Sequence, residues 1–348
     1  MSTGVPDPEA RMITALPLRT LADLGPLART LPGPDAAAAD AARARLADLA
    51  MPPGALGRLG ATVPFLAGWQ GRARPRLDRV QALVFAGNHG VCAQGVAAFP
   101  QAVTAAMVAT FETGGAAINQ LCREAGAALE VVALDLDRPT GDFTEGDAMT
   151  HAEALEALAR GAAAVDPEAD ALVLGEMGIG NSTTAAALAA LHLGGAAADW
   201  VGPGAGADDA VMARKRRAVE AAVTRHAGQG GAAALAAIGG REQAALCGAA
   251  LAARRAGVPV VLDGFICTAA MLPLHAEDPS ALDHCLVGHA SAEPGHAPLL
   301  AALGKTPLLD LGMRLGEGTG AALAISVLRG AVACHGGMAT LAEVGVEA

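Results

Sequence analysis

The stretch ALVLGEMGIGNSTT at residues 171–184 decides the fold. It opens with four apolar residues, continues into a glycine-rich turn and leads into the alanine-rich run at 185–193. This order is typical of a buried strand, a glycine loop and a helix. Apolar strands that alternate with helices form a parallel sheet covered on both faces. The stretch therefore predicts an α/β fold.

Short apolar runs recur at residues 80–86, 129–136 and 258–262. Alanine-rich helical stretches separate these runs, and glycines or acids follow them. We expect a Rossmann-like parallel sheet within residues 71–320, with the ligand at the carboxyl ends of its strands.

Both ends of the chain have a helical pattern. Residues 1–70 read as helical segments broken by prolines, and residues 321–348 are helical again. We expect these two segments to pack together as a smaller helical domain.

Composition narrows the functional class. The chain has 348 residues, of which 53% are hydrophobic and 17% charged, so disorder is not expected. The net charge of −11 argues against a general nucleic-acid binder. With no tyrosine, six phenylalanines and two tryptophans, a flat ligand is expected to meet aliphatic, methionine and main-chain walls.

Location follows from what the chain lacks. Residues 1–11 show no basic-then-apolar signal, and residues 177–198 are too polar to span a bilayer. Six scattered cysteines without a C-x-x-C pattern indicate reduced thiols. We expect a cytoplasmic protein with no membrane partner.

The glycine-rich turn at 175–184 predicts a phosphate site, because main-chain amides and the helix dipole attract anions. An ordinary turn is the alternative. Asn181 or Ser182 is expected to cap the helix. The turn lacks the lysine of a nucleoside-triphosphate loop, and Thr183 stands where a dinucleotide fingerprint has its last glycine. Glu176 next to a phosphate suggests a hydroxyl-rich ribose between them.

Several other polar residues follow apolar runs. His89 can donate a hydrogen bond to a ligand or be structural, and Asp263 can orient a ligand or cap the next helix. Lys215 belongs to a basic cluster at 214–217 that suits simple helix electrostatics, although one lysine can turn inward toward a phosphate. The loop at 289–296 holds two histidines and a glutamate, but their spacing matches no standard zinc pattern, so we expect no metal.

Glu317 lies between Gly316 and Gly318 in an otherwise apolar run. Poor solvation raises the proton affinity of such a carboxylate, which suits a general base. A turn glutamate exposed to water is the alternative.

Four motifs in register resemble the nicotinate-nucleotide–dimethylbenzimidazole phosphoribosyltransferase family of the cobalamin lower-ligand pathway. They are PPGALGRL at 52–59 and the segments 175–184, 289–296 and 307–321. The resemblance implies a Rossmann-like domain, a small helical domain from both chain ends and a homodimer. It also implies that Glu317 is the general base.

The resemblance implies that Glu176, Gly178, Gly180, Asn181, Ser182 and Lys215 bind the substrate. We add His89, Asp263 and Leu315 as further expected substrate-binding residues. The implied reaction moves ribose 5-phosphate from nicotinate mononucleotide to a benzimidazole, giving α-ribazole 5-phosphate, and needs no metal or redox cofactor.

The chain departs from the family at several positions. Asn88 stands where the family has Asp, Ser182 where it has Thr, and GPGAG at 202–206 where it has GRGTG. Ala97 and Ala105 stand where members can carry Ser and Gln near the base. We therefore expect several benzimidazoles to be accepted.

Three other functions compete with this interpretation. A dinucleotide oxidoreductase needs the complete glycine fingerprint. A non-catalytic nucleotide carrier does not need Glu317. A transferase that uses phosphoribosyl pyrophosphate is suggested faintly by residues 135–141.

Overall fold

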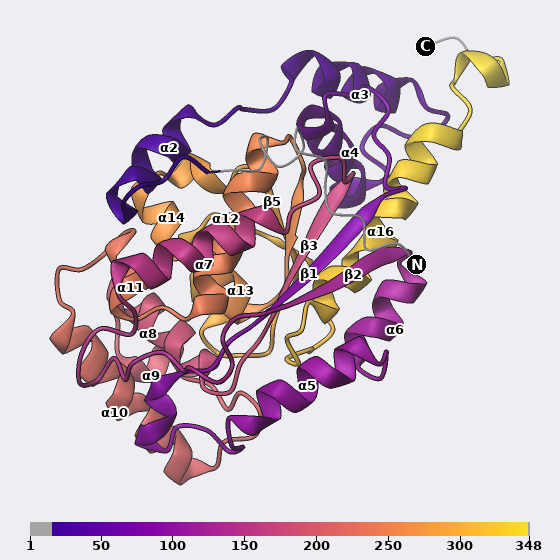
Figure 1. Ribbon diagram of the computed structural model, residues 1–348. Helices are drawn as coiled ribbons and strands as arrows, with labels where there is room; N and C mark the ends of the chain where they lie inside the picture. Colours follow the sequence, from indigo (N-terminus) through magenta and orange to yellow (C-terminus); the bar gives the residue numbers. More distant parts are fainter. Residues whose placement is uncertain (1–15, 347–348) are drawn as a thin grey trace.

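A six-stranded parallel sheet forms the centre of the computed structural model, which describes residues 16–346 (Figure 1). The strand order is β2-β1-β3-β4-β5-β6. The strands are β1 (Val80–Ala86), β2 (Ala127–Ala133), β3 (Ala171–Met177), β4 (Val260–Leu262), β5 (Cys285–His289) and β6 (Pro307–Leu309). This sheet confirms the predicted Rossmann-like α/β fold. The expectation about a signal at residues 1–11 lies outside the described residues.

The predicted strands match the sheet unevenly. β1 has the predicted bounds, whereas β2 ends three residues before position 136. β3 runs past the predicted apolar run to Met177, so Glu176 belongs to a strand. β5 and β6 were not predicted, because both are short and one ends in a glycine and a histidine. Gly288 of β5 lets α16 approach: a Cβ there would lie 2.6 Å from Cα of Ala321.

The helices cover both faces of the sheet (Figure 1). Along β1, Leu83 and Phe85 join one hydrophobic core, whereas Val80 and Val84 join another. This alternation follows from the two-residue repeat of a strand. The first core includes residues of α2 (Leu24–Thr30), α7 (His151–Ala163), α8 (Asn181–Leu193), α10 (Asp209–Arg225), α11 (Ala233–Ala237), α12 (Arg241–Arg255), α13 (Phe265–Ala269) and α14 (Leu272–Glu277). The second includes residues of α4 (Gly57–Gln70), α5 (Ala102–Glu112), α6 (Ala117–Glu124) and α16 (Thr319–Gly337).

Seven further helices lie in the described residues. They are η1 (Leu21–Asp23), α3 (Ala36–Asp48), η2 (Gly90–Gln94), α9 (Ala197–Trp200), η3 (Pro279–Leu282), α15 (His296–Ala302) and η4 (Ala342–Val344).

Within residues 16–346, α16 is the one helix long and apolar enough to cross a membrane by length and composition. Its buried residues, among them Ile325 and Leu328, pack into the second core beside β3 and β5. The apolar character of α16 is therefore explained by its place in the core of the fold.

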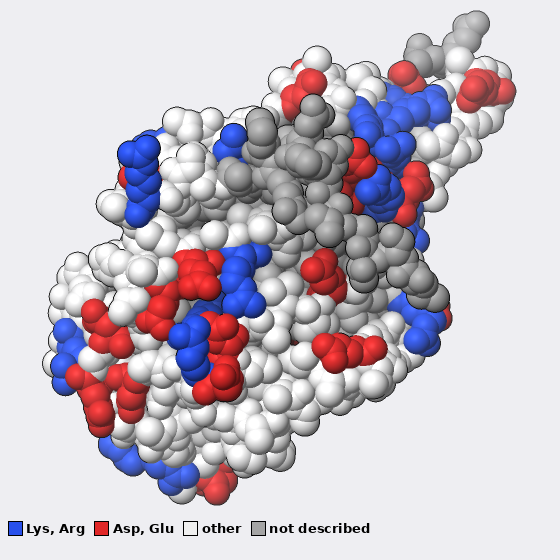
Figure 2. All heavy atoms as spheres, in the orientation of Figure 1, with Lys and Arg blue, Asp and Glu red and all other residues white. Residues whose placement is uncertain are grey.

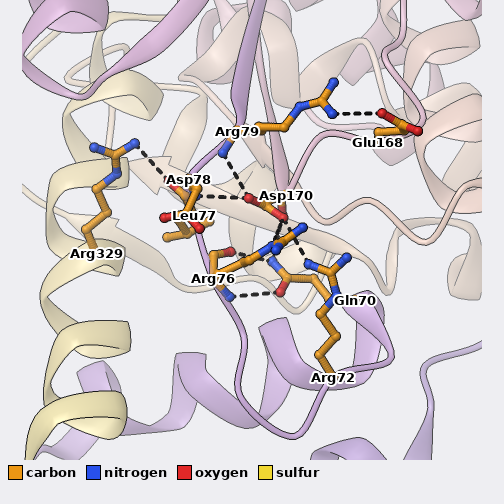
Figure 3. A network of polar contacts seen from close by, with 9 residues as sticks. All are labelled: Gln70, Arg72, Arg76, Leu77, Asp78, Arg79, Glu168, Asp170 and Arg329. Carbon is orange, nitrogen blue, oxygen red and sulfur yellow. Dashed lines mark hydrogen bonds and ion pairs between the residues drawn. The ribbon is translucent and has the colours of Figure 1, made fainter.

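Asp170, next to the start of β3, ties the segment after α4 to the sheet (Figure 3). One carboxylate oxygen lies 3.0 Å from Nε of Arg76 and 3.3 Å from Nη1 of Arg72. The other accepts main-chain N–H bonds from Asp78 and Arg79, each 2.9 Å long. Since the Asp170 side chain is 2% exposed, this network compensates a buried charge.

We propose that α3, α4 and the C-terminal part of α16 form the smaller helical unit expected from the two chain ends. α4 packs against both α3 and α16, whereas α2 packs against α14.

On the face drawn in Figure 2, Lys and Arg side chains gather at the end of the molecule that carries α3 and α4.

Candidate functional site

A cavity of about 540 Å³ lies at the carboxyl ends of the strands. The chain moves from β1 to one neighbour, β2, and then returns to the other, β3, so the cavity lies at a topological switch point. The expected site residues that line it are Glu176, Gly178, Gly180, Asn181, Ser182, Lys215 and Leu315.

The glycine-rich turn connects β3 directly to α8. Gly180 has a φ of 99°, a left-handed conformation that favours glycine, and it is the residue that precedes the helix. The prediction that Asn181 or Ser182 caps α8 is wrong, because both are already helical and no side chain caps this end. Ser182 is the second helical residue, whose N–H has no acceptor within the helix. The turn thus presents main-chain donors to the cavity.

Lys215 turns inward from α10, as one of the two interpretations of the basic cluster predicted. It is 1% exposed, whereas Arg216 and Arg217 are exposed. Its Nζ donates to the Ser182 hydroxyl at 3.1 Å and to the Gly202 carbonyl at 2.6 Å. Burial lowers the pKa of Lys215 to about 8. A cation therefore lies beside the start of α8.

Two charged residues that line the cavity were not among the site residues predicted from the sequence. Arg314 donates to the Gly204 carbonyl at 2.7 Å, and the buried carboxylate of Glu293 accepts from the Gly204 N–H at 3.0 Å. Both line the cavity, and both belong to motifs that the sequence had singled out. The segment 202–206, where this chain departs from the family, is thus held by charges from distant parts of the chain.

Glu176 lies at the end of β3 and is 4% exposed. Its carboxylate accepts a hydrogen bond from the side-chain amide of Asn181. Burial and then the nearby Asp263 and Glu242 carboxylates raise the pKa of Glu176 well above its usual range. A protonated carboxyl at this place can donate a hydrogen bond as well as accept one.

Glu317 is buried, and its pKa is raised by burial and by Asp263. This agrees with the expectation of poor solvation and not with an exposed turn. Its φ of 64° is left-handed, between two glycines that have φ of 84° and 85°. Such a conformation costs roughly 1–2 kcal/mol for a residue with a side chain and marks functional sites.

The Glu317 side chain does not itself line the cavity, although Leu315 and Gly316 do. The main-chain N–H of Ile118, at the start of α6, offsets part of this rise in the pKa of Glu317. One of its carboxylate oxygens, Oε2, has no hydrogen-bond partner among the described residues. That oxygen is available to a proton donor.

Asp263 caps α16 and does not cap the helix that follows it in the sequence. It is fully buried, and it accepts main-chain N–H bonds from Gly318 at 3.1 Å, Gly320 at 2.8 Å and Ala321 at 3.0 Å. His289 Nε2 lies 3.3 Å from the same carboxylate. Asp263 therefore holds the turn that carries Glu317, a structural link that the sequence did not show.

His89 lies beneath the glycine-rich turn and is absent from the cavity wall. It is 1% exposed, and its Nδ1 lies 3.0 Å from the hydroxyl of Thr184. A Cβ on Gly178 would lie 3.1 Å from Nε2 of His89. Of the two interpretations left open for His89, its position beneath the turn favours the structural one over direct contact with a substrate.

The apolar surroundings differ from those expected. Leu311 and Leu315 are 63% and 58% exposed, so they do not shield Glu317 from water. Two phenylalanines, Phe99 and Phe265, line the cavity together with Met177, which makes the wall more aromatic than composition suggested. Of the positions expected near the base, Ala97 lines the cavity, whereas Ala105 is exposed and lies outside it. In residues 16–346 no group of three or more His, Cys, Asp or Glu side chains is arranged to hold a metal ion.

Comparisons with known proteins agree with this geometry. Residues 31–346 match the profile of a family described as phosphoribosyltransferase. A relative from Rhodobacter capsulatus, named nicotinate-nucleotide–dimethylbenzimidazole phosphoribosyltransferase, is 59% identical over 96% of this chain and 100% of its own. A relative of the same name from Ruegeria pomeroyi is 59% identical over 95% of this chain and 98% of its own.

The chain belongs to this phosphoribosyltransferase family. The crystal structure of CobT from Thermus thermophilus is similar, with a TM-score of 0.84 and 43% identity over 89% of this chain and 99% of that one. This phosphoribosyltransferase is therefore an enzyme of the pentosyltransferase class, which moves a phosphoribosyl group. The competing interpretations as an oxidoreductase or as a non-catalytic carrier are set aside.

Proposed function

We propose that the enzyme transfers ribose 5-phosphate from nicotinate mononucleotide to 5,6-dimethylbenzimidazole or a related base, giving α-ribazole 5-phosphate and nicotinate for cobalamin assembly. The observation that carries the proposal is a cavity with a phosphate-type end at Ser182 and Lys215 and a buried carboxylate next to its wall at Glu317. The names of the relatives support the two substrates.

The phosphate is expected at the start of α8, where main-chain donors and the helix dipole favour an anion. Lys215 adds a charge there, and Gly178 and Gly180, which have no side chain, let the main chain approach the phosphate closely, next to Asn181. The ribose then extends toward Glu176, whose carboxyl can bond to a hydroxyl.

Nicotinate leaves with little help from the protein. The pyridinium nitrogen of nicotinate mononucleotide is positive, so the bond to the anomeric carbon breaks with its electron pair returning to the ring. The unprotonated ring nitrogen of the benzimidazole forms the new bond with its lone pair from the opposite face, which inverts the anomeric carbon. The proton on the other ring nitrogen passes to Glu317. Glu317 is the residue after Gly316, which lines the cavity, and its Oε2 has no hydrogen-bond partner among the described residues.

We also propose a homodimer in the cytoplasm. Exposed apolar side chains, Phe99, Leu311 and Leu315, support an interface that covers them. All six cysteines are free, which supports a reducing compartment. Light scattering should give a mass of twice 34.3 kDa. A mass of 34.3 kDa at every concentration would contradict the dimer.

Incubation with nicotinate mononucleotide and 5,6-dimethylbenzimidazole, read by mass spectrometry, tests the reaction. We expect α-ribazole 5-phosphate and nicotinate in equal amounts, and neither product when the base is omitted. Release of nicotinate without the new nucleotide would indicate hydrolysis. Product formation from phosphoribosyl pyrophosphate instead would favour the competing transferase.

A further inference from the structure

A buried carboxylate that the proposed reaction does not use lies on the far side of the glycine-rich turn. Glu242, the second residue of α12, is 0% exposed. Its Oε1 lies 3.0 Å from Nε2 of His89, although neither carboxylate oxygen nor this ring nitrogen makes a hydrogen bond with any described residue. Removal of a carboxylate from water is costly unless it is compensated. His89 is the ionisable side chain that lies against this carboxylate.

The contact continues from His89 to α8. Nδ1 of His89 lies 3.0 Å from the hydroxyl of Thr184, which is fully buried in the first turn of that helix. The Thr184 hydroxyl can donate to Nδ1 of a neutral imidazole, and Nε2 of the same ring is the atom that lies against Glu242. Three side chains from the loop after β1, from α8 and from α12 thus form one buried chain.

The main chain around Glu242 leaves no room for a side chain at two nearby positions. A Cβ on Gly87 would lie 2.6 Å from the Glu242 carboxylate. A Cβ on Gly240 would lie 2.4 Å from the His89 ring and 2.5 Å from the same carboxylate. All three distances are too short for real atoms, so glycine at these two positions lets His89 and Glu242 lie against each other.

The other side of His89 touches the turn that faces the cavity. A Cβ on Gly178 would lie 3.1 Å from the His89 ring, and a Cβ on Gly180 would lie 3.2 Å from His89 Cβ. The residue after Glu242 reaches the same turn, because Nε2 of Gln243 lies 3.5 Å from the carbonyl of Asn181. The start of α12 therefore contacts the turn at 178–182 directly through Gln243 and indirectly through Glu242 and His89.

We propose that Thr184, His89 and Glu242 are positioning residues for the substrate phosphate. They hold the main chain of the turn at 178–182 in place and do not contact the substrate. This inference rests on the proposed function, because it assigns the turn to the phosphate. It predicts that the phosphate is the substrate group most affected. Because Glu242 also lies near Glu176 and helps to raise its pKa, Thr184→Val, which changes no charge, is the decisive variant.

The test compares nicotinate mononucleotide with nicotinate riboside, which lacks the phosphate, in the full-length enzyme. Glu242→Gln keeps the size of the side chain and removes its charge, and Thr184→Val keeps the shape and removes the hydroxyl. We expect kcat/KM for the mononucleotide to fall about tenfold or more in each variant, since small misplacements near a site have effects up to about a hundredfold. The value for the riboside should stay within about twofold. Equal losses for both substrates would overturn the inference.

Binding of inorganic phosphate, measured by calorimetry, gives a second readout that needs no turnover. Both variants should bind phosphate about tenfold more weakly than the wild type. Unchanged phosphate binding in Thr184→Val, which is the variant least expected to disturb folding, would also overturn the inference. If the wild type binds phosphate but does not convert the mononucleotide, the proposed function fails, and the phosphate measurement still decides this inference.

His284→Asn is the matched control. His284 is also a fully buried histidine that contacts α12, with Nε2 2.8 Å from the carbonyl of Ala250. Its loss should lower stability and leave the ratio of mononucleotide to riboside kcat/KM at the wild-type value. A combined His89→Gln and Glu242→Gln variant should lose no more than the worse single variant, because the two side chains act through one contact.

Discussion

The main-chain N–H of Glu317 donates to the main-chain carbonyl of Glu176 at 3.2 Å. This bond joins the end of β3 to the turn before α16 and brings two buried carboxylates to one side of the cavity. Two glycines allow the approach: a Cβ on Gly175 would lie 2.6 Å from the Glu317 carbonyl, and a Cβ on Gly316 would lie 2.6 Å from the Glu176 carboxylate. Burial, and then the Asp263 carboxylate, raises the pKa of both glutamates.

Glu317→Gln should lower kcat by about 10²–10⁴-fold, the usual contribution of a general base, while the KM for nicotinate mononucleotide changes little. Because burial raises the pKa of Glu317, wild-type kcat should rise with pH through a value above 4.5, and the variant should lose this limb. The exposed Glu124, changed to Gln, is the control. A fall in kcat of less than about tenfold would show that Glu317 is not the base.

Glu176→Gln should change how stability depends on pH. A carboxyl with a raised pKa keeps its proton in the folded protein after the unfolded chain has lost it, so the free energy of unfolding falls as pH rises above 4.5. The variant lacks this decrease. Urea unfolding at pH 5 and pH 8 should show Glu176→Gln gaining stability relative to the wild type at the higher pH. A constant difference between the two pH values would contradict the raised pKa.

Lys215→Ala should raise the KM for nicotinate mononucleotide about 10- to 150-fold, which corresponds to the loss of a charge-assisted contact of roughly 1.5–3 kcal/mol. Arg216→Ala removes an exposed charge from the same helix and should leave this KM unchanged. Steady-state kinetics on both variants distinguishes a phosphate contact from a general effect of charge on α10.

The wild-type KM for the nucleotide should also depend on pH through Lys215. Burial lowers the pKa of this ammonium to about 8, so the free enzyme loses the charge, and with it phosphate affinity, as pH rises above that value. Lys215→Arg keeps its charge throughout and should show a flat KM between pH 7 and about pH 9. An equal rise in KM for both proteins would assign the effect to another group.

The base side of the cavity should accept several benzimidazoles. Ala97 offers no polar group there, and a methyl group more or less in an apolar pocket changes discrimination by about 1–3 kcal/mol. Ala97→Ser should narrow the range of bases, whereas Ala105→Ser, outside the cavity, should not. Strict use of one base, with all others below about 0.1% of its kcat/KM, would contradict this expectation.

The amino-acid sequence alone determined the α/β class, the turn between β3 and α8, and the candidate base at Glu317. Apolar periodicity and glycine placement are local signals, and these features depend on residues next to one another in the chain. The short strands β5 and β6 were not predicted, because three to five residues carry too little periodicity.

Only the tertiary structure decided which distant side chains meet. The strand order sets Asp263 after β4 against the start of α16, His89 after β1 against α12, and Lys215 of α10 against Ser182. Each contact joins segments that are far apart in sequence, and the charge on Asp263 or Lys215 looks the same in a string of letters whether it is solvated or buried. Burial and partner choice are consequences of packing across the sheet, which no local pattern encodes.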